Sequence, residues 1–574
     1  MQQTDPTYEQ ADDTVETEHR SSRGLRRLLY LACAALAVSL LVLLPPYISV
    51  NRYQRRIATS ISDSLGRPVH LDKVTLNLLP MPGFTFQNFV VDEDPAFGSE
   101  PTIRANSVRA TLRLSSLWTK RVEFSTISFD EPSVNLVHTT AGKWNIQSIL
   151  LHTAHIDAAP TAQRRAGPAP RFPYIEATGA RLNLKLGQEK TPISLTEADF
   201  ALWLPEPQEW HLRLQAHPVR TDTNASDTGT IALEGTLGHA ASLSQVPINL
   251  NGEWRNAQLG EATRVLLGRD AGLRGVMTLS VSAQGTVGNN TLQTRLRLTD
   301  ARRADFIPQR TLTVDMQCLA TATSNFFAFE NIRCDWPPAA SSGAPKLAIT
   351  GGLPYIRRPS SATLNVVVPG LPAATLLDWL HVASPRVPDD IAATGSLAGT
   401  LSYHPDSPAT AATLGWTGEL LMTHPTLVNP RAGSSLVVGD VALASTAPEP
   451  PPTRNAKHQA APPTASPSLA TTGFLLEPTS LALGGKDPAI LDGHFDSTGY
   501  TLHLTGMASP ARMLALAAAL PPFGDGLAAV LPTNRAAGPF RVDLTATRSW
   551  GKPQTWTDAT THPSTPHPQR KPHH

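Results

Sequence analysis

The chain has 574 residues, which is too long for one ordinary hydrophobic core and fits three or four domain-sized units or one elongated array. Its 48 Lys and Arg residues nearly balance 47 Asp and Glu residues, so the net charge of +1 argues against a whole-chain electrostatic grip on nucleic acid or anionic lipid. Proline supplies 51 residues, about 9% against a usual ~5%, which argues against long helical bundles and coiled coils. The three cysteines exclude a disulfide-stapled scaffold and a multi-cysteine zinc or iron–sulfur module.

The first 50 residues predict a tail followed by a membrane anchor. Residues 1–27 are polar, acidic at first and then basic, which is typical of a disordered cytoplasmic tail. Residues 28–44 read LLYLACAALAVSLLVLL, and an uncharged helix of this length spans about 26 Å, the short end of a bilayer core. A long charged stretch precedes the run and no clean A-x-A site follows it, so we expect an uncleaved transmembrane anchor over 28–50 rather than a signal peptide.

Basic residues flank this anchor on both sides and give only a slight preference for a cytoplasmic N-terminus. They are Arg20, Arg23, Arg26 and Arg27 before it, and Arg52, Arg55 and Arg56 after it. No second apolar run of spanning length follows in the sequence. We therefore expect a single-pass protein whose body, after Val50, lies outside the cytoplasm.

Beyond the anchor the sequence predicts a mainly β body. Residues 51–65 can form an amphipathic helix with Ile57, Ile61 and Leu65 on one face, and after Gly66 the hydrophobic period changes to two. Short helices are expected at 257–267, 373–382 and 510–520. Proline-rich stretches divide the rest into an N-terminal β domain (51–152), a linker (153–170), a central β region (171–445), a Pro/Ala linker (446–470), a β-rich region (471–550) and a disordered tail (551–574).

The alternation is compatible with two architectures. One is a set of β-sandwiches or barrels, each of which buries one face against itself. The other is one long, curved antiparallel sheet whose apolar face lines a groove for acyl chains. Periodicity alone does not separate them. The candidate lining residues of such a groove are Leu184, Leu202, Leu214, Leu233, Leu279 and Leu296.

The sequence carries no recognisable catalytic or metal-binding signature. It lacks H-E-x-x-H, G-x-S-x-G and an EF-hand loop, and Gly142-Lys143 is followed by Trp144 instead of the Ser or Thr of a phosphate-binding loop. The tail histidines sit among prolines, which is typical of a solvated tail. We therefore expect no enzyme activity and no catalytic, cofactor or metal site.

Cys318 and Cys334 share the strand parity of their apolar neighbours, and their separation suits two adjacent antiparallel strands. In an oxidising compartment a cross-strand disulfide between them is one hypothesis. The other is two buried free thiols that act as small hydrophobic side chains. The sequence leaves both open.

Two segments carry a family resemblance. Residues 55–118 combine a helix ending in Gly-Arg-Pro-Val, a Leu-Pro-x-Pro-Gly turn and a strand that closes on Asp-Pro-Ala-Phe-Gly; residues 129–150 lead from Asp-Glu-Pro to Gly-Lys-Trp-Asn. This pattern resembles the AsmA family of bacterial envelope proteins, with further similarity at 176–204 and 251–275. The resemblance implies an inner-membrane anchor, a periplasmic body and repeating β-groove units like those of chorein-type bridge proteins. It brings no catalytic residues.

The functional expectation is a non-enzymatic protein of the bacterial inner membrane that handles lipid in envelope biogenesis. The implied partners are phospholipid or another acyl-chain lipid, the inner membrane through the anchor, and outer-membrane assembly proteins, but not nucleic acid. The alternative is a modulator of outer-membrane protein assembly, or of protein targeting to the membrane, with packed β domains and no lipid. An extracytoplasmic hydrolase is the least favoured class, because no nucleophile constellation is visible.

Overall fold

The computed structural model is mainly β and divides into two compact units. The first comprises Met1–Thr153, Pro168–Lys190 and Ala201–Leu204, and the second comprises Ala154–Gly167, Thr191–Phe200 and Pro205–His574. The structure describes residues 21–43, 54–78, 81–113, 124–139, 143–146, 173–186, 189–206, 209–306, 312–338, 345–356, 358–383, 387, 391–405, 415–429, 434–445, 473–519, 524–531 and 538–558. Both predicted linkers, 153–170 and 446–470, lie outside the described residues.

The described residues of the first unit form two helices and seven strands. They are α1 (Ser21–Leu43), α2 (Gln54–Leu65), β1 (Val69–His70), β2 (Lys73–Asn77), β3 (Gly83–Val91), β4 (Ile103–Leu112), β5 (Phe124–Asp130), β6 (Ser133–His138) and β7 (Tyr174–Leu186). β1 and β2 pair with one edge of β3, β4 pairs with the other, and β5 and β6 share the far edge of β4. Glu131 lies between β5 and β6, and its φ of 45° interrupts the extended backbone there.

β7 departs from the antiparallel arrangement that the sequence predicts. It runs parallel to both β5 and β6, with Thr126 opposite Tyr174 at one end and His138 opposite Leu186 at the other. Parallel neighbours need a long crossover connection, and more than thirty residues separate β6 from β7 in the sequence. Alternation reports which face a side chain occupies and not the direction of its neighbour, so the sequence could not reveal this pair.

Helix α2 closes the core of the first unit. Ile57, Ile61 and Leu65 pack against a buried cluster that includes Val74 and Phe86. Gly66 then takes φ 65°, a left-handed conformation that ends the helix at little cost for a residue without a Cβ. The predicted amphipathic helix and its apolar face are thus observed.

Helix α1 is apolar and exposed along its described side chains. Leu28, Leu31 and Leu36 are each more than 60% exposed. Within the described part of the chain, no helix is both long and apolar enough to cross a membrane. Residues 44–50 of the predicted anchor lie outside the described residues, and the transmembrane helix predicted over 28–50 is not confirmed.

The second unit holds a long antiparallel sheet. β8 (Glu189–Glu206) lies at the division between the units. The strands that follow are β9 (Glu209–Arg220), β10 (Thr230–Leu237), β11 (Pro247–Gln258), β12 (Leu273–Thr286), β13 (Asn289–Arg303), β14 (Leu312–Thr323), β15 (Ala328–Trp336), β16 (Leu347–Leu353), β17 (Thr363–Pro372), β18 (Ala392–Tyr403), β19 (Trp416–Asn429), β20 (Ser434–Val437), β21 (Val441–Ser445), β22 (Phe474–Leu481), β23 (Ala489–Phe495), β24 (Gly499–Ala508), β25 (Phe540–Ser549) and β26 (Thr555–Asp558).

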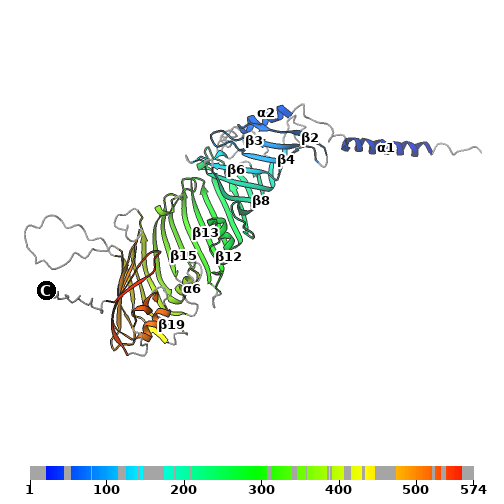
Figure 1. Ribbon diagram of the computed structural model, residues 1–574. Coiled ribbons are helices and arrows are strands. Elements are labelled where there is room, and N and C mark those ends of the chain that lie inside the picture. Colours follow the sequence, from blue (N-terminus) through cyan, green and yellow to red (C-terminus); the bar gives the residue numbers. More distant parts are fainter. Residues whose placement is uncertain are drawn as a thin grey trace, which may run out of the picture. The chain divides into compact units, whose positions relative to one another are not determined.

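Each strand from β9 to β19 pairs with the next along the chain, and the sheet is curved (Figure 1). β20 and β21 both pair with β19, and the order then continues from β21 to β26. One sheet of this kind corresponds to the second of the two predicted architectures. The sequence predicts a disordered tail over 551–574, but the structure has the strand β26 in this range. The strand forms because Thr555 and Trp556 pair with Thr547 and Ala546 of β25.

The described α-helices of this sheet all occupy connections at the same end of its strands. They are α5 (Leu259–Leu267) between β11 and β12, α6 (Ala373–Ala383) between β17 and β18, and α7 (Pro510–Ala519) and α9 (Leu527–Val530) between β24 and β25. The first three match the predicted helices to within two residues. Gly268 ends α5 at φ 76°, where its N–H donates to the carbonyl oxygen of Arg264.

Candidate functional site: an apolar strip along the sheet

A row of directly paired residues crosses the second unit from β9 to β19. Because directly opposed residues in antiparallel strands project to the same face, the whole row lies on one face of the sheet. We call this row the apolar strip: Leu214, Leu233, Gly252, Val281, Thr294, Cys318, Cys334, Ile349, Val366, Leu401 and Gly418. Every member is half-buried, which is unlike the floor of a packed core.

A packed hydrophobic cluster, which we call a rim, lies on each side of the strip. Toward the strand ends that the α-helices connect, α5 buries Leu259, Ala262 and Val265 in a cluster with Trp254 and Met277. α6 adds Trp379 and Val382 to the same cluster. Toward the opposite strand ends, Val246, Ile248 and Ala283 form a second cluster, against which Phe326 packs.

The two rims leave a narrow channel. On β12, Leu279 packs on the first rim, Ala283 belongs to the second, and Val281 lies between them. Four residues of strand cover about 13 Å, which leaves room for one extended hydrocarbon chain. Eleven strands at ~4.8 Å spacing give the strip a length of about 48 Å. The geometry is therefore that of a shallow apolar groove running across the strands.

The six leucines that the sequence predicts to line the groove do not all lie in the apolar strip. Leu214 and Leu233 lie in the strip, directly opposite each other. Leu279 and Leu296 lie on the same face but pack against the cluster beneath α5 and α6.

The other two predicted leucines belong to the first unit. Leu184 is half-buried on β7, opposite Leu136 of the parallel strand β6. Leu202 is half-buried on β8. The prediction overlooked Val281, Ile349, Val366 and Leu401 as lining residues, although Val281 and Leu401 alternate with polar neighbours in the sequence.

Cys318 and Cys334 occupy the middle of the strip. They are direct cross-strand partners on β14 and β15, and their sulfur atoms are bonded. Of the two alternatives that the sequence left open, the structure therefore has the disulfide. Cys33, on α1, is a free and exposed thiol.

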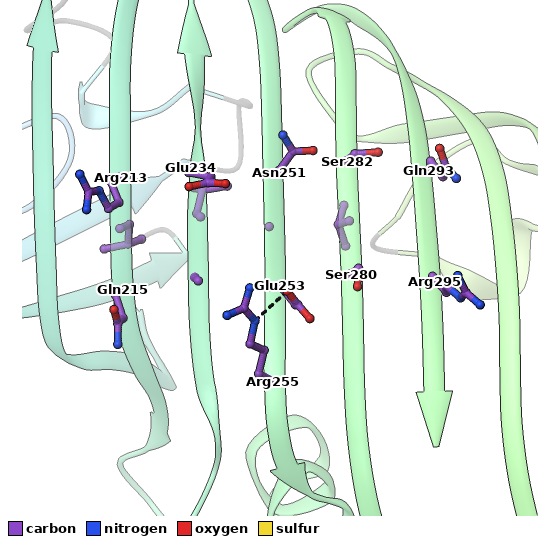
Figure 2. Close-up of a pocket in the computed structure, with 15 residues that line it drawn as sticks. Arg213, Gln215, Glu234, Asn251, Glu253, Arg255, Ser280, Ser282, Gln293 and Arg295 are labelled. Carbon is purple, nitrogen blue, oxygen red and sulfur yellow. Dashed lines mark hydrogen bonds and ion pairs between the residues drawn. The ribbon is translucent and has the colours of Figure 1, made fainter. Parts of the chain in front are cut away.

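The opposite face of the same strands is polar. Arg213, Glu234, Asn251, Ser282 and Gln293 are successive cross-strand partners, each next to a strip residue in sequence. Figure 2 shows these and neighbouring polar side chains projecting from consecutive strands. They line a hollow of about 510 Å³, whose lining also includes the strip residues Leu214, Leu233, Gly252 and Val281. The sheet thus separates an apolar face from a hydrated one.

Ion pairs reinforce the polar face. Arg295 donates to both carboxylate oxygens of Asp315 at 2.7 and 2.6 Å, across β13 and β14. These hydrogen bonds hold the pKa of Asp315 below its ordinary value of 3.8. On β11, Arg255 donates to Glu253 at 2.7 Å (Figure 2). Each of these groups already has a charged partner, so the face shows the pattern of a solvated surface.

A buried polar network lies in the first unit at the motifs singled out in the sequence. Arg67 of Gly-Arg-Pro-Val donates to Glu93, whose side chain is 1% exposed. Asn145 of Gly-Lys-Trp-Asn donates to Glu93 Oε2 at 2.6 Å and accepts from the Val137 N–H at 3.0 Å. Asn183 on β7 donates to Asn135 Oδ1 at 3.1 Å. The motif residues thus join β6, β7 and the end of α2, which is a structural role.

A metal site is not evident in the described part of the chain. No group of three or more His, Cys, Asp or Glu side chains there could hold a metal ion.

A long antiparallel β-sheet with one apolar face, one polar face and α-helices at one end of its strands defines a mainly β protein with a groove-like sheet in its second unit. The model of the AsmA family matches residues 27–175, so this segment of the chain is similar to that family. No curated protein and no solved structure matches the chain.

Proposed function

We propose that the protein handles phospholipid or another acyl-chain lipid, which lies along the apolar strip with its hydrocarbon across the strands. The observation that carries the proposal is the strip itself: eleven paired positions on consecutive strands and on one face, all half-buried, with a packed rim on each side where the strip crosses β10 to β13. Leaving apolar surface in water is unfavourable by about 25 cal/mol per Å², so a hydrocarbon ligand gains by covering it. Contiguous apolar surface that the chain itself leaves uncovered marks binding sites for ligands, proteins or membranes.

We further propose that α1 anchors the chain in the bacterial inner membrane, with the N-terminus in the cytoplasm and the body in the periplasm. The exposed leucines of α1 and the flanking arginines support the anchor and its orientation. A disulfide on the sheet is consistent with an oxidising compartment. In this location, the proposed role is lipid movement between the inner and outer membranes, without enzymatic activity.

A second candidate function is that of a modulator of outer-membrane protein assembly or of protein targeting to the membrane. The observation that favours it is the closed core at the C-terminal end of the sheet, where Leu483, Leu504 and Leu527 are almost fully buried. Such a packed end presents outer surfaces to proteins and has no need of lipid.

The experiment is to extract and quantify the phospholipid that co-purifies with the full chain. Leu214→Arg places a charge in the strip, and Gln215→Arg places the same charge one residue away on the polar face. We expect the first to lose bound phospholipid and the second to retain it. A wild-type chain without phospholipid, or two variants with equal content, contradicts lipid handling by the strip.

A further inference from the structure

An apolar cavity of about 230 Å³ lies beneath α7, at the C-terminal end of the sheet. We call it the end pocket. Its lining includes Met422, Leu436, Val438, Leu476, Leu491 and Leu516. The hydroxyl of Thr479, which also lines it, lies within hydrogen-bonding distance of the carbonyl oxygens of Glu477 and Asp440, at 3.0 and 3.3 Å. That hydroxyl is therefore already satisfied by the chain itself.

The end pocket lies on the same face of the sheet as the apolar strip. On β18, Leu397 follows the parity of the strip residue Leu401, and it pairs directly with Met422. Met422 pairs with Val441 on β21, which also lines the pocket. The apolar face thus leads from the strip to the pocket, and beyond it the core of α7 and α9 closes the face.

The chemistry of the end pocket restricts its occupant. A peptide segment would bring N–H and C=O groups into a lining that offers them no partner, which is unfavourable. An apolar cavity of ~150 Å³ is known to stay dry and to accept a small hydrocarbon. A cavity of about 230 Å³ has room for a short alkyl segment without a headgroup.

We infer that the end pocket receives the terminal methyl end of an acyl chain whose remainder lies in the apolar strip. This inference rests on the proposed function and adds a direction to it: the tail points toward the C-terminal end of the sheet, and the headgroup points toward β9. The strip is then a path with one closed end, at which the tail of the bound chain is held.

Two photoreactive fatty acids test the inference on the full chain. One is palmitate with a diazirine at its methyl end, and the other is palmitate with a diazirine beside its carboxylate. We expect the methyl-end probe to label peptides of β19, β20 or α7, and the carboxylate-end probe to label strip peptides nearer β9. Peptide mapping by mass spectrometry locates each adduct.

Matched variants connect the label to the pocket. Met422→Trp fills the pocket and should abolish its labelling, whereas Leu421→Trp places the same ring on the opposite face, where Leu421 is 42% exposed, and should leave labelling intact. If the thermal unfolding midpoint shows that Met422→Trp does not fold, Val438→Trp and its exposed neighbour Val437→Trp form a second pair.

The outcomes separate the inference from the proposed function. Labelling of the strip by both probes, with none in the pocket, overturns the inference and leaves lipid handling intact. Equal labelling of the pocket by the two probes overturns the assigned direction. Pocket labelling that appears only after deletion of residues 446–470 overturns the inference, because it shows that this segment of the chain, and not an acyl chain, occupies the pocket in the full-length protein. Absence of labelling anywhere overturns the inference together with the proposed function.

Discussion

Leu233→Arg separates an open strip from a packed core. Leu233 is half-buried in the strip, between Leu214 and Gly252 on the neighbouring strands. Leu504 is the matched control, because it is also a leucine on the same sheet but is 1% exposed inside the C-terminal core. The same substitution at the two sites therefore differs only in what lies over the side chain.

The expected magnitudes follow from burial. Full burial of a leucine side chain is worth about 1.5–3 kcal/mol, so losing the half-burial of Leu233 should cost about 1 kcal/mol. The arginine tip can reach water along the uncovered strip, which avoids the cost of a buried charge. At Leu504 the charge has no such route, and the loss should reach about 4–5 kcal/mol or more.

Thermal unfolding of the full chain, followed by tryptophan fluorescence, measures the difference. At about 2–4 °C per kcal/mol for large domains, Leu233→Arg should lower the midpoint by only a few degrees. Leu504→Arg should lower it by about 10 °C or more, or abolish folding. If Leu233→Arg is as damaging as Leu504→Arg, the strip is a packed core and the groove interpretation is wrong.

Four further predictions address other parts of the chain. Under denaturing, non-reducing conditions a thiol reagent should modify one cysteine per chain, because Cys318 and Cys334 are bonded to each other. Modification of all three cysteines contradicts the disulfide. Closure of its loop should stabilise the fold by at most about 3 kcal/mol. Glu93→Ala should destabilise the first unit by about 3–5 kcal/mol, because it removes the carboxylate that balances the charge of the buried Arg67, and an unfolding midpoint close to that of the wild type would show that the pair is dispensable. Because folding lowers the pKa of Asp315, its ion pair stabilises the fold above about pH 4 and loses that contribution as the pH falls through the lowered pKa; Asp315→Asn should flatten the acid limb of midpoint against pH, and an unchanged limb contradicts this assignment. A periplasm-dependent phosphatase fused after Ser445 should be active, and an inactive fusion would reverse the proposed topology.

Local patterns predicted most elements of the sheet but not their partners. The alternation of Leu279, Val281 and Ala283 correctly indicated one face of a strand, and the apolar spacing of Ile57, Ile61 and Leu65 correctly indicated α2. Both signals depend on short-range periodicity. The parallel position of β7 depends on a long crossover, which no local pattern encodes.

The candidate site was only partly predictable for a related reason. Leu214 and Leu279 are both leucines with a polar residue on either side in the sequence, yet the first lies in the strip and the second packs under α5 and α6. Which leucine is covered depends on where the helical connections fold back over the sheet. The end pocket is likewise formed by side chains from β19 to α7, which are distant in sequence.

Site-specific photo-crosslinking in cells tests the central claim most directly. Val366 and Val367 are adjacent valines on β17 with opposite orientations: Val366 belongs to the strip, and Val367 lies on the other face. A photoreactive phenylalanine analogue at each position in turn allows a comparison by mass spectrometry of the purified adducts. Lipid handling by the strip predicts a phospholipid adduct at position 366 and none at position 367. Adducts at both positions, or at neither, would contradict it.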